Sequence, residues 1–281
     1  MRIGIIGLGL IGGSLGIDLV ERGHEVVGVG RRPHSCQRAK ELGAVHEAGC
    51  HYPLLSSVDV VFVCTPIAQI ESVVAAIAPH LPPHAIVTDV GSVKASVVAS
   101  AQPHWRQFIG GHPMAGKSEA GLEVAEAGLF RDRPYVLTPT ADTPPLALEI
   151  LKGLVADLGA RLYCCDPDSH DQAVAWISHL PVMVSSSLIN ACLQEADPDL
   201  QQLAQALASS GFRDTSRVGG GPPELGLMMA RYNREALLHT LDIYQKVITQ
   251  ISRAVEAEDW TAVEQHLQQS CAARPGFVES R

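Results

Sequence analysis

A short glycine-rich segment near the N-terminus has the spacing to bind phosphate groups. It follows the pattern G-x-G-x-x-G and consists of Gly7, Leu8, Gly9, Leu10, Ile11 and Gly12. The pattern comes after a predicted strand at 3–6 and opens a predicted helix at 11–22, which is the context of a dinucleotide site. The first glycine allows a tight turn, the second lets a pyrophosphate approach the backbone, and the third permits close packing of helix on strand. The helix N-terminus would then present N–H groups to the phosphates.

The residues after the second predicted strand, at 25–29, indicate which dinucleotide binds. An NAD site usually has Asp or Glu here, to hold the ribose 2′-hydroxyl. This chain has no carboxylate there; the stretch includes Gly30, Arg31, Arg32 and Ser35. Two guanidinium groups suit a 2′-phosphate, so we predict NADP as the cofactor, the alternative being two solvated loop arginines. After the strand at 58–63 come three residues that we expect to line the same crevice, near the ribose on the nicotinamide side: Cys64, Thr65 and Pro66.

One of the twelve histidines is placed for catalysis. His112 lies in the segment 110–116, which reads GGHPMAG and which we predict to be a loop directly after a strand at 108–109. Such a loop lies at the carboxyl edge of the sheet, where these folds bind ligands. Glycines on both sides would let the backbone approach a ligand closely. A neutral imidazole accepts a proton near pH 7, so His112 is the candidate base.

Strands and helices alternate over the first part of the chain. Strands are predicted at 3–6, 25–29, 58–63, 85–88, 108–109, 135–137 and 161–164, and helices at 11–22, 34–43, 67–80, 93–101 and 144–158. Strand followed by helix, repeated, predicts a parallel sheet with both faces covered. The fold class is therefore α/β, with an N-terminal Rossmann-type dinucleotide-binding domain over 1–164.

The remainder, 165–281, has no strand pattern and is predicted to be an all-α C-terminal domain. Helices are expected at 168–194, 199–210, 223–256 and 259–270. One wide apolar face in the third of these consists of Leu237, Leu238, Leu241, Tyr244, Val247, Ile248 and Ile251. Such a face is either core or a dimer surface. We expect a homodimer formed through this domain.

Composition limits the classes of partner. The chain has 281 residues, 46% of them hydrophobic, and a formal net charge of −9. The acid surplus argues against nucleic acid or an anionic membrane as the main partner. No apolar run reaches the ~18 residues of a membrane helix and no signal peptide is recognisable, so we expect a cytoplasmic protein. The seven cysteines lack CxxC and metal-ligand spacing; we expect reduced, mostly buried thiols and no metal.

Motifs along essentially the whole chain resemble the prephenate/arogenate dehydrogenase family of tyrosine biosynthesis. They are the glycine pattern at 7–12, DVGSVK at 89–94, GGHPMAG at 110–116, LF at 129–130, TP at 138–139, DP at 166–167 with HD at 170–171, SHLP at 178–181 and GFRDTSR at 211–217. The resemblance implies oxidative decarboxylation of a cyclohexadiene. Hydride leaves the hydroxyl-bearing ring carbon for the nicotinamide, CO₂ leaves across the ring, and aromatisation drives the step.

The resemblance also implies roles for individual residues. His112 matches the catalytic histidine, and Ser92 matches the serine that hydrogen-bonds both His112 and the substrate hydroxyl. Arg217 matches the arginine that binds the substrate carboxylate. His179 is assigned to substrate or cofactor positioning, the alternative being a satisfied core histidine. Gly91, in the same motif as Ser92, is expected to contact the cofactor.

Three positions depart from the family pattern. Val182 stands where many prephenate-using relatives have histidine, Gly226 where many have tryptophan, and Lys117 where many have threonine. Together with the NADP-type site, these departures favour arogenate, whose side chain is an amino acid, over prephenate, a keto acid. The alternatives are a prephenate or dual-specificity cyclohexadienyl dehydrogenase, a β-hydroxyacid dehydrogenase using Lys246, and a catalytically silent NADP-binding sensor.

Overall fold

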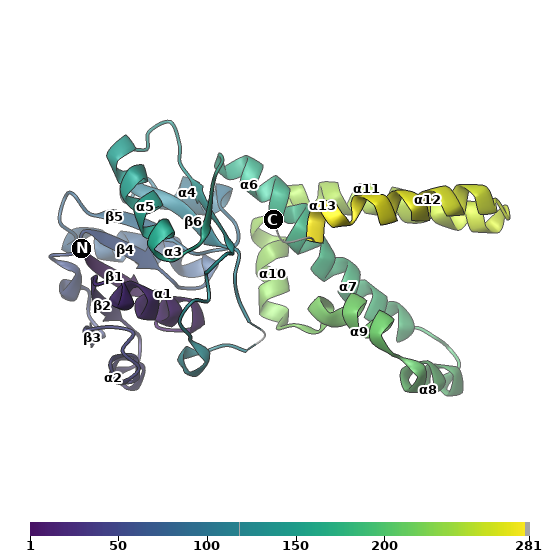
Figure 1. Cartoon of the computed structure of the whole chain (residues 1–281), viewed down its shortest axis with the longest axis horizontal. Helices are drawn as coiled ribbons and strands as arrows, with labels where there is room; N and C mark the ends of the chain where they lie inside the picture. The colour runs from purple at the N-terminus through teal and green to yellow at the C-terminus, as the bar shows by residue number, and fades with distance from the viewer. Residues whose placement is uncertain (118, 279–281) are drawn as a thin grey trace. The chain divides into compact units, whose positions relative to one another are not determined.

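Alternating β-branched runs and helical segments fold into one sheet with helices on both faces (Figure 1). The structure is a computed structural model that describes residues 1–117 and 119–278. Within them the sheet has eight strands in the order β3-β2-β1-β4-β5-β6-β7-β8. The strands are β1 (Arg2–Ile6), β2 (Glu25–Val29), β3 (Glu47–Gly49), β4 (Val60–Val63), β5 (Ile86–Asp89), β6 (Phe108–Pro113), β7 (Pro134–Thr138) and β8 (Arg161–Cys164). Neighbouring strands are parallel, except that β6 and β7 are antiparallel.

Two buried clusters show that both faces of the sheet are covered. The flanking helices are α1 (Leu10–Glu21), α2 (Pro33–Glu41), α3 (Ile67–Ile77), α4 (Ala95–Ala101) and α5 (Pro145–Asp157). Leu15 of α1 and Leu151 of α5 pack in one cluster with Phe62 of β4. Ile70 of α3 and Val98 of α4 belong to the other. Strands β4 and β5 are buried at every residue, as expected of parallel strands between two helical layers.

The rest of the chain is helical. Its elements are α6 (Pro167–Val174), a π-helical turn (Ala175–His179), α7 (Leu180–Cys192), α8 (Pro198–Leu207), α9 (Ser210–Ser216), a 3₁₀ turn (Arg217–Gly220), α10 (Pro223–Tyr232), α11 (Arg234–Glu256), α12 (Trp260–Ala273) and α13 (Pro275–Val278). The chain divides into two compact units, residues 1–234 and 235–281. The predicted fold class, a Rossmann-type domain followed by helices, is confirmed.

The segment around His112 is a strand and not the predicted loop. Strand β6 continues to Pro113, and His112 pairs with Val136 of β7. A Cβ on Gly110 would lie 2.4 Å from the Thr138 Oγ1 atom, and one on Gly111 would lie 2.7 Å from the Asp89 carbonyl oxygen. These glycines therefore permit close approach of neighbouring strands, whereas the sequence suggested close approach of a ligand.

Other expectations differ in detail. The short strand β3 was not predicted. The single helix expected at 223–256 is two helices, because α10 ends at Tyr232 with Asn233 as its C-cap and α11 begins at Arg234. The expectation of mostly buried cysteines is wrong, because Cys36 alone is classed as buried among the seven, all of which the structure describes. Cys192 is exposed because it lies at the exposed C-terminal end of α7, and Cys271 is exposed on α12, most of whose residues face solvent.

One helical stretch, Pro167–Cys192, is long and apolar enough to span a membrane by length and composition alone. No such stretch was expected from the sequence, because histidine, glycine, proline and serine were counted as interruptions of an apolar run. The stretch carries His170, Asp171 and His179, which are buried and hydrogen-bonded to other residues of the same compact unit. The core helix of a folded domain meets the same length and composition criteria, so this helix alone is weak support for a membrane span.

Candidate active site

A cavity of about 360 Å³ opens beside the glycine-rich turn between β1 and α1. Its lining includes most of the residues that the sequence assigned to the cofactor, namely Gly7, Leu8, Gly9, Gly30, Arg31, Arg32, Ser35, Cys64, Thr65 and Pro66. The lining does not include Leu10, Ile11, Gly12 or Gly91, although the first three lie in the first turn of α1. It adds residues that sequence reasoning missed, among them Cys50, Tyr52 and Gln69.

The three glycines of the pattern have distinct steric surroundings. Gly7 has a φ of +97°, and a Cβ there would lie 2.4 Å from the Cys64 carbonyl oxygen. A Cβ on Gly12 would lie 2.1 Å from the Gly7 carbonyl oxygen. Apart from its chain neighbours, no described residue has an atom within 4 Å of such a Cβ on Gly9. Gly7 and Gly12 thus serve the turn and its packing, and Gly9 leaves space open at the start of α1.

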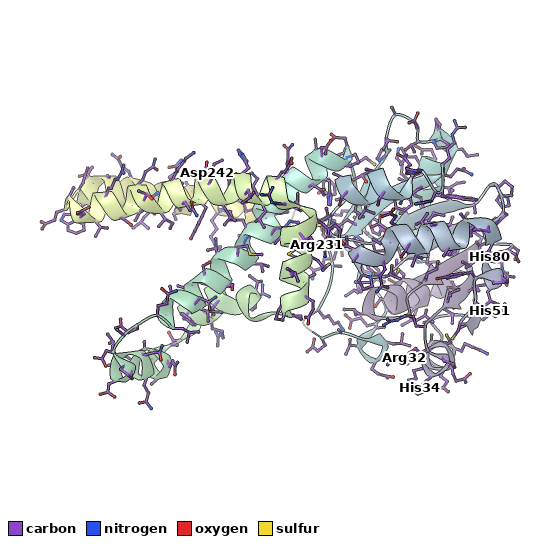
Figure 2. All side chains as sticks on the ribbon, turned by 180° about the vertical axis from the view of Figure 1, so that it is seen from behind. Arg32, His34, His51, His80, Arg231 and Asp242 are labelled. Carbon is purple, nitrogen blue, oxygen red and sulfur yellow. The ribbon has the colours of Figure 1, made fainter. Side chains whose placement is uncertain are left out.

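The cavity fits a dinucleotide in four respects. Helix α1 begins without a side-chain cap and without an acidic residue in its first turn, so its N–H groups are free to meet phosphate. The Thr65 Oγ1 atom lining the cavity is buried without a hydrogen-bond partner among the described residues. Arg31 and Arg32 are exposed at the rim, and Figure 2 shows Arg32 at the surface. None of the described residues in the lining is acidic.

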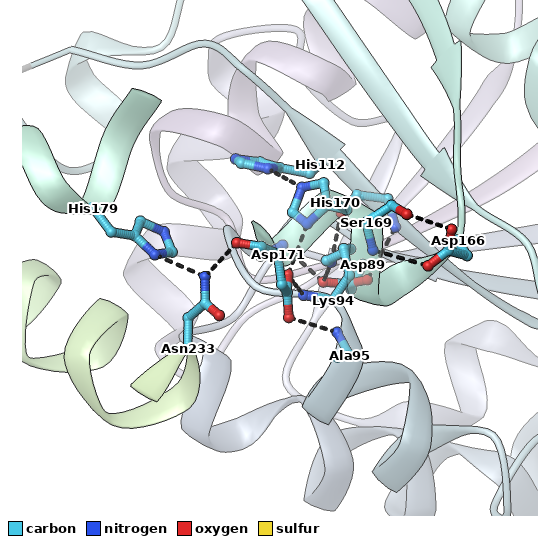
Figure 3. A network of polar contacts seen from close by, with 12 residues as sticks. Asp89, Lys94, Ala95, His112, Asp166, Ser169, His170, Asp171, His179 and Asn233 are labelled. Atoms are coloured by element: carbon cyan, nitrogen blue, oxygen red, sulfur yellow. Dashed lines mark hydrogen bonds and ion pairs between the residues drawn. The ribbon is translucent and has the colours of Figure 1, made fainter. Parts of the chain in front are cut away.

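His112 belongs to a chain of buried polar contacts (Figure 3). Its Nδ1 atom lies 2.8 Å from Nε2 of His170, and the His170 Nδ1 atom lies 2.8 Å from Oδ1 of Asp171. The Asp171 carboxylate accepts hydrogen bonds from the backbone N–H groups of Lys94 (2.7 Å) and Ala95 (2.9 Å), at the start of α4. Helix α6 is thereby joined to the end of the sheet that carries His112.

Burial sets the protonation of His112. His112 is 8% exposed, and burial, together with the unfavourable electrostatic effect of the neighbouring His170, Lys94 and His179, holds the pKa of its ring well below the ordinary value of 6.5. The ring is therefore neutral at pH 7, which is the form that can accept a proton.

A buried ion pair supports the strand beneath His112. The Lys94 Nζ atom pairs with the Asp89 carboxylate and donates to the Gly111 carbonyl oxygen at 2.7 Å. Asp89 also accepts from the backbone N–H of Gly91 (2.8 Å) and of Gly111 (3.1 Å). Burial lowers the pKa of Lys94, an effect that the charge of Asp89 opposes. The DVGSVK motif thus ties the end of β5 to β6 next to His112.

His179 lies at the end of the π-helical turn between α6 and α7. Pro181 follows in the first turn of α7 and cannot donate to the carbonyl four residues before it, which favours a widened turn here. The His179 Nδ1 atom lies 3.1 Å from Nδ2 of Asn233, while its Nε2 is buried without a partner among the described residues. Burial lowers the His179 pKa to about 4, so this ring is also neutral at pH 7.

Ser92 and Lys117 were both expected in the site, and the structure gives the hydrogen-bond partners of the His112 ring and of Lys117. Ser92 is half-buried, and among the described residues the hydrogen bond of the His112 ring goes to His170 and not to Ser92. Lys117 pairs with Glu126 at 2.7 Å and donates to the Val124 carbonyl oxygen at 3.1 Å, so its ammonium group is engaged within its own loop.

Arg217 begins the 3₁₀ turn that packs against α7 and is exposed. The Ser185 Oγ atom of α7 donates to the Thr215 carbonyl oxygen at 2.9 Å and accepts from the Gly219 N–H at 2.8 Å. A Cβ on Gly219 would lie 2.4 Å from the Ser186 backbone nitrogen. The Ser185 hydroxyl therefore fixes the segment that carries Arg217. No hydrogen bond or ion pair between described residues joins Arg217 to His112.

Two of the unusual positions come together in the structure. A Cβ on Gly226 of α10 would lie 3.5 Å from the Val182 Cγ1 atom and 3.9 Å from the Met183 Cε atom of α7. The two departures from the family pattern, valine for histidine at 182 and glycine for tryptophan at 226, therefore lie at one contact between α7 and α10.

Sequence reasoning missed the residues that hold the two histidines. His170 and Asp171 were noted in the HD motif without a role, and Asp89, Lys94 and Asn233 were not considered as site residues. An Asp after a strand and a Lys five residues later give no signal by themselves. Only the folded chain shows that Asp171 lies beside the start of α4.

Two family models match consecutive parts of this chain. The model described as prephenate dehydrogenase, nucleotide-binding domain, matches residues 15–164, and the model described as prephenate dehydrogenase, dimerization domain, matches residues 166–269. The chain belongs to the prephenate dehydrogenase family. It is therefore an oxidoreductase, and its first part is a nucleotide-binding domain.

Individual members of the family are similar over nearly all of the chain. Prephenate dehydrogenase of Bacillus subtilis is 31% identical over 91% of this chain and 70% of its own length. Cyclohexadienyl dehydrogenase of Zymomonas mobilis is 30% identical over 97% of this chain and 94% of its own. The crystal structure of Synechocystis arogenate dehydrogenase is 50% identical, covers 99% of this chain and 100% of its own, and has a TM-score of 0.92.

Proposed function

We propose that this member of the family is an NADP-dependent arogenate dehydrogenase, which converts L-arogenate to L-tyrosine. The observation that carries the substrate assignment is the 50% identity with Synechocystis arogenate dehydrogenase over 99% of the chain. The 30–31% identity with the prephenate and cyclohexadienyl dehydrogenases named above is weaker by comparison. The contact between Val182 and Gly226, two positions without the large or polar side chains of many relatives, also supports a differently shaped substrate pocket.

The cofactor assignment rests on the rim of the cavity beside the glycine turn. Arg31 and Arg32 are exposed there, and the described lining has no carboxylate that would repel a 2′-phosphate. The N–H groups at the start of α1 would hold the pyrophosphate, and the unpartnered Thr65 hydroxyl would bond the ribose on the nicotinamide side. When bound, the nicotinamide supplies the hydride acceptor.

In the proposed reaction His112 acts as the general base. Its neutral ring takes the proton of the substrate hydroxyl while hydride leaves the same carbon. Loss of CO₂ from the opposite ring carbon leaves its electron pair in the ring and produces a phenolate. The proton held by His112 then returns to the phenolate oxygen, so the histidine ends the cycle as it began. Aromatisation provides the driving force.

The remaining residues would position the substrate. Arg217 would bind a carboxylate by its planar pair of N–H donors, on the segment that Ser185 fixes. His179 has a buried, unpartnered Nε2 and would bond substrate or cofactor there. Ser92, half-buried at the end of β5, would bond the substrate hydroxyl. Lys117, which pairs with Glu126, would contact the substrate by exchanging this partly exposed partner.

A specific observation favours one second candidate. The Zymomonas mobilis relative, 30% identical over 94% of its length, is a cyclohexadienyl dehydrogenase, a class that accepts both substrates. A prephenate or dual-specificity activity is therefore the alternative, with 4-hydroxyphenylpyruvate as the product from prephenate. The proposal also includes a homodimer in the cytoplasm, with no nucleic-acid or membrane partner.

The test is reduction of the cofactor in four parallel assays, which combine arogenate or prephenate with NADP or NAD. The proposal requires the highest kcat/KM for arogenate with NADP. Turnover of prephenate at least as efficient as that of arogenate would overturn the substrate assignment. Equal use of NAD would overturn the reading of Arg31 and Arg32.

A further inference from the structure

Asp171 connects to both buried histidines of the site, through its side chain on one side and its backbone carbonyl on the other (Figure 3). We infer that Asp171, acting through His170 and Asn233, fixes opposite tautomers on the two rings. His112 keeps Nε2 free of hydrogen, and His179 carries hydrogen on Nε2. The tautomers are assigned from hydrogen-bond partners and distances. The catalytic roles given to them rest on the proposed function.

We call the two sets of hydrogen bonds that start at Asp171 its arms. The first arm joins the Asp171 carboxylate to His112 through His170. Both carboxylate oxygens accept hydrogen bonds, Oδ1 from the backbone N–H of Lys94 and Oδ2 from that of Ala95. The His170 Nδ1 atom, 2.8 Å from Asp171 Oδ1, must therefore carry hydrogen. The inferred arrangement places this single hydrogen on the His170 ring, so that its Nε2 atom accepts from the Nδ1–H of His112 at 2.8 Å. This leaves a lone pair on the His112 Nε2 atom, which is the base that the reaction needs.

The second arm runs from the Asp171 backbone carbonyl to His179. A carbonyl oxygen only accepts, so the Asn233 atom 2.7 Å from it must be the amide NH₂ group. The same NH₂ group lies 3.1 Å from the His179 Nδ1 atom and donates its second hydrogen there. His179 Nδ1 is therefore bare and Nε2 carries the hydrogen. That N–H group is the buried donor without a partner among the described residues.

The two arms give the site one acceptor and one donor with complementary roles. The His112 Nε2 lone pair suits a substrate hydroxyl, which donates its proton. The His179 Nε2–H suits an acceptor oxygen of substrate or cofactor. His170, Asp171 and Asn233 are then positioning residues, because they act only through the rings they orient. A tautomer fixed by a buried neighbour is a known requirement of histidine bases.

The direct test measures the tautomers and needs no turnover. Enzyme with ¹⁵N-labelled histidine is studied by NMR near neutral pH, where the ¹⁵N shift separates a protonated ring nitrogen from a bare one. Signals are assigned by their loss in His112→Asn and His179→Asn. The inference requires Nδ1–H on His112 and Nε2–H on His179. The reverse tautomer, or a mixture, at either ring overturns the inference for that arm, even if the four parallel assays of substrate and cofactor support the proposed function.

Matched variants test the arms separately. Glutamine at position 170 offers an oxygen that can accept from His112 Nδ1–H, whereas leucine offers none. We expect His170→Leu to lower kcat about 10²-fold, the scale of a lost general base, with KM little changed and with mixed His112 tautomers. His170→Gln should retain most of the activity and the Nδ1–H tautomer. Equal losses in both variants would show that His170 only fills space and would overturn the first arm.

Asn233→Asp tests the second arm, because a carboxylate has no N–H to donate. The His179 ring should then reverse and carry hydrogen on Nδ1, while the His112 tautomer stays unchanged. An unchanged His179 tautomer would overturn the second arm. If the wild-type enzyme turns over none of the four combinations of substrate and cofactor, the proposed function fails. The NMR result still decides the tautomers.

Discussion

At the scale of single residues, Arg31 and Arg32, which follow β2, are proposed to determine the cofactor preference. Arg31→Ala combined with Arg32→Ala should raise KM for NADP at least ~10-fold, because a hydrogen bond to a charged group contributes about 1.5–3 kcal/mol. KM for NAD, which has no 2′-phosphate, should change little. Steady-state kinetics with both cofactors measure this. Arg106→Ala, at an exposed arginine outside the cavity lining, is the control. Equal increases of KM for both cofactors would show that these arginines do not read the 2′-phosphate.

A buried neutral histidine also makes stability depend on pH. The pKa of His179 is about 4 in the folded chain against an ordinary value of 6.5. The unfolded chain therefore binds more protons between these values, so the stabilisation is complete above pH 6.5 and is lost as pH falls toward 4. For one ring the loss is on the order of 3 kcal/mol, from about 1.4 kcal/mol per pKa unit. The burial of His112 acts in the same direction.

Urea unfolding at several pH values measures this effect. The wild-type chain should lose stability between pH 6.5 and 4 more steeply than His179→Gln, in which the titrating ring is absent. Identical slopes for the two proteins would show that the ring does not titrate as its burial requires.

At the scale of elements, the 3₁₀ turn Arg217–Gly220 needs glycine at one position and tolerates alanine at the next. A Cβ on Gly219 meets the Ser186 backbone nitrogen at 2.4 Å, whereas one on Gly220 meets no atom within 4 Å. Gly219→Ala should displace the turn, raise KM for arogenate about tenfold and destabilise the fold by about 1–3 kcal/mol, the usual cost of overpacking. Gly220→Ala is the matched control and should behave like the wild type. Similar effects of both substitutions would contradict the assignment of Arg217 to substrate binding on this turn.

The elements also show what sequence patterns reveal and what they do not. Strands β1, β2, β4 and β5 were predictable, because fully buried parallel strands are continuous apolar runs and the glycine turn marks the first crossover. The extension of β6 to Pro113 was not, because glycine usually interrupts strands and here is required by neighbouring atoms. His112, His179 and Arg217 came from motifs. The roles of His170, Asp171 and Asn233 did not, since the contacts that join them to Lys94, His112 and His179, and to each other across the site, link residues 54–77 positions apart.

At the scale of the whole molecule, the net charge is negative, whereas the side chains proposed to bind the ligands are positive. The chain carries a formal net charge of −9, yet NADP and the proposed substrate are both anionic. Arg31 and Arg32 at the cavity rim and Arg217 on its turn are exposed cations available to these ligands. Net charge therefore argues against nucleic acid as a partner but does not describe the binding sites.

Exposed apolar side chains on helix α11 are typical of a dimer interface, which a measurement of molecular mass can test. Leu238 is 49% exposed and Ile248 is 44% exposed on this helix, and the matching family model is described as a dimerization domain. Light scattering after gel filtration should give about 60 kDa, twice the chain mass of 29.9 kDa. Leu238→Glu combined with Ile248→Glu should give the monomer mass. Glu264→Gln on α12, an exposed polar exchange, is the control. A dimer mass for the double variant would show that this face is not the interface.

The proposed reaction depends on His112 as its general base, and the kinetics of His112→Asn test that role. The buried ring of His112, neutral at pH 7 and oriented by His170, should be indispensable for proton removal. We expect kcat for arogenate with NADP to fall ~10²-fold or more, with KM changed only slightly. A near-normal kcat with only KM raised would contradict the catalytic role of His112.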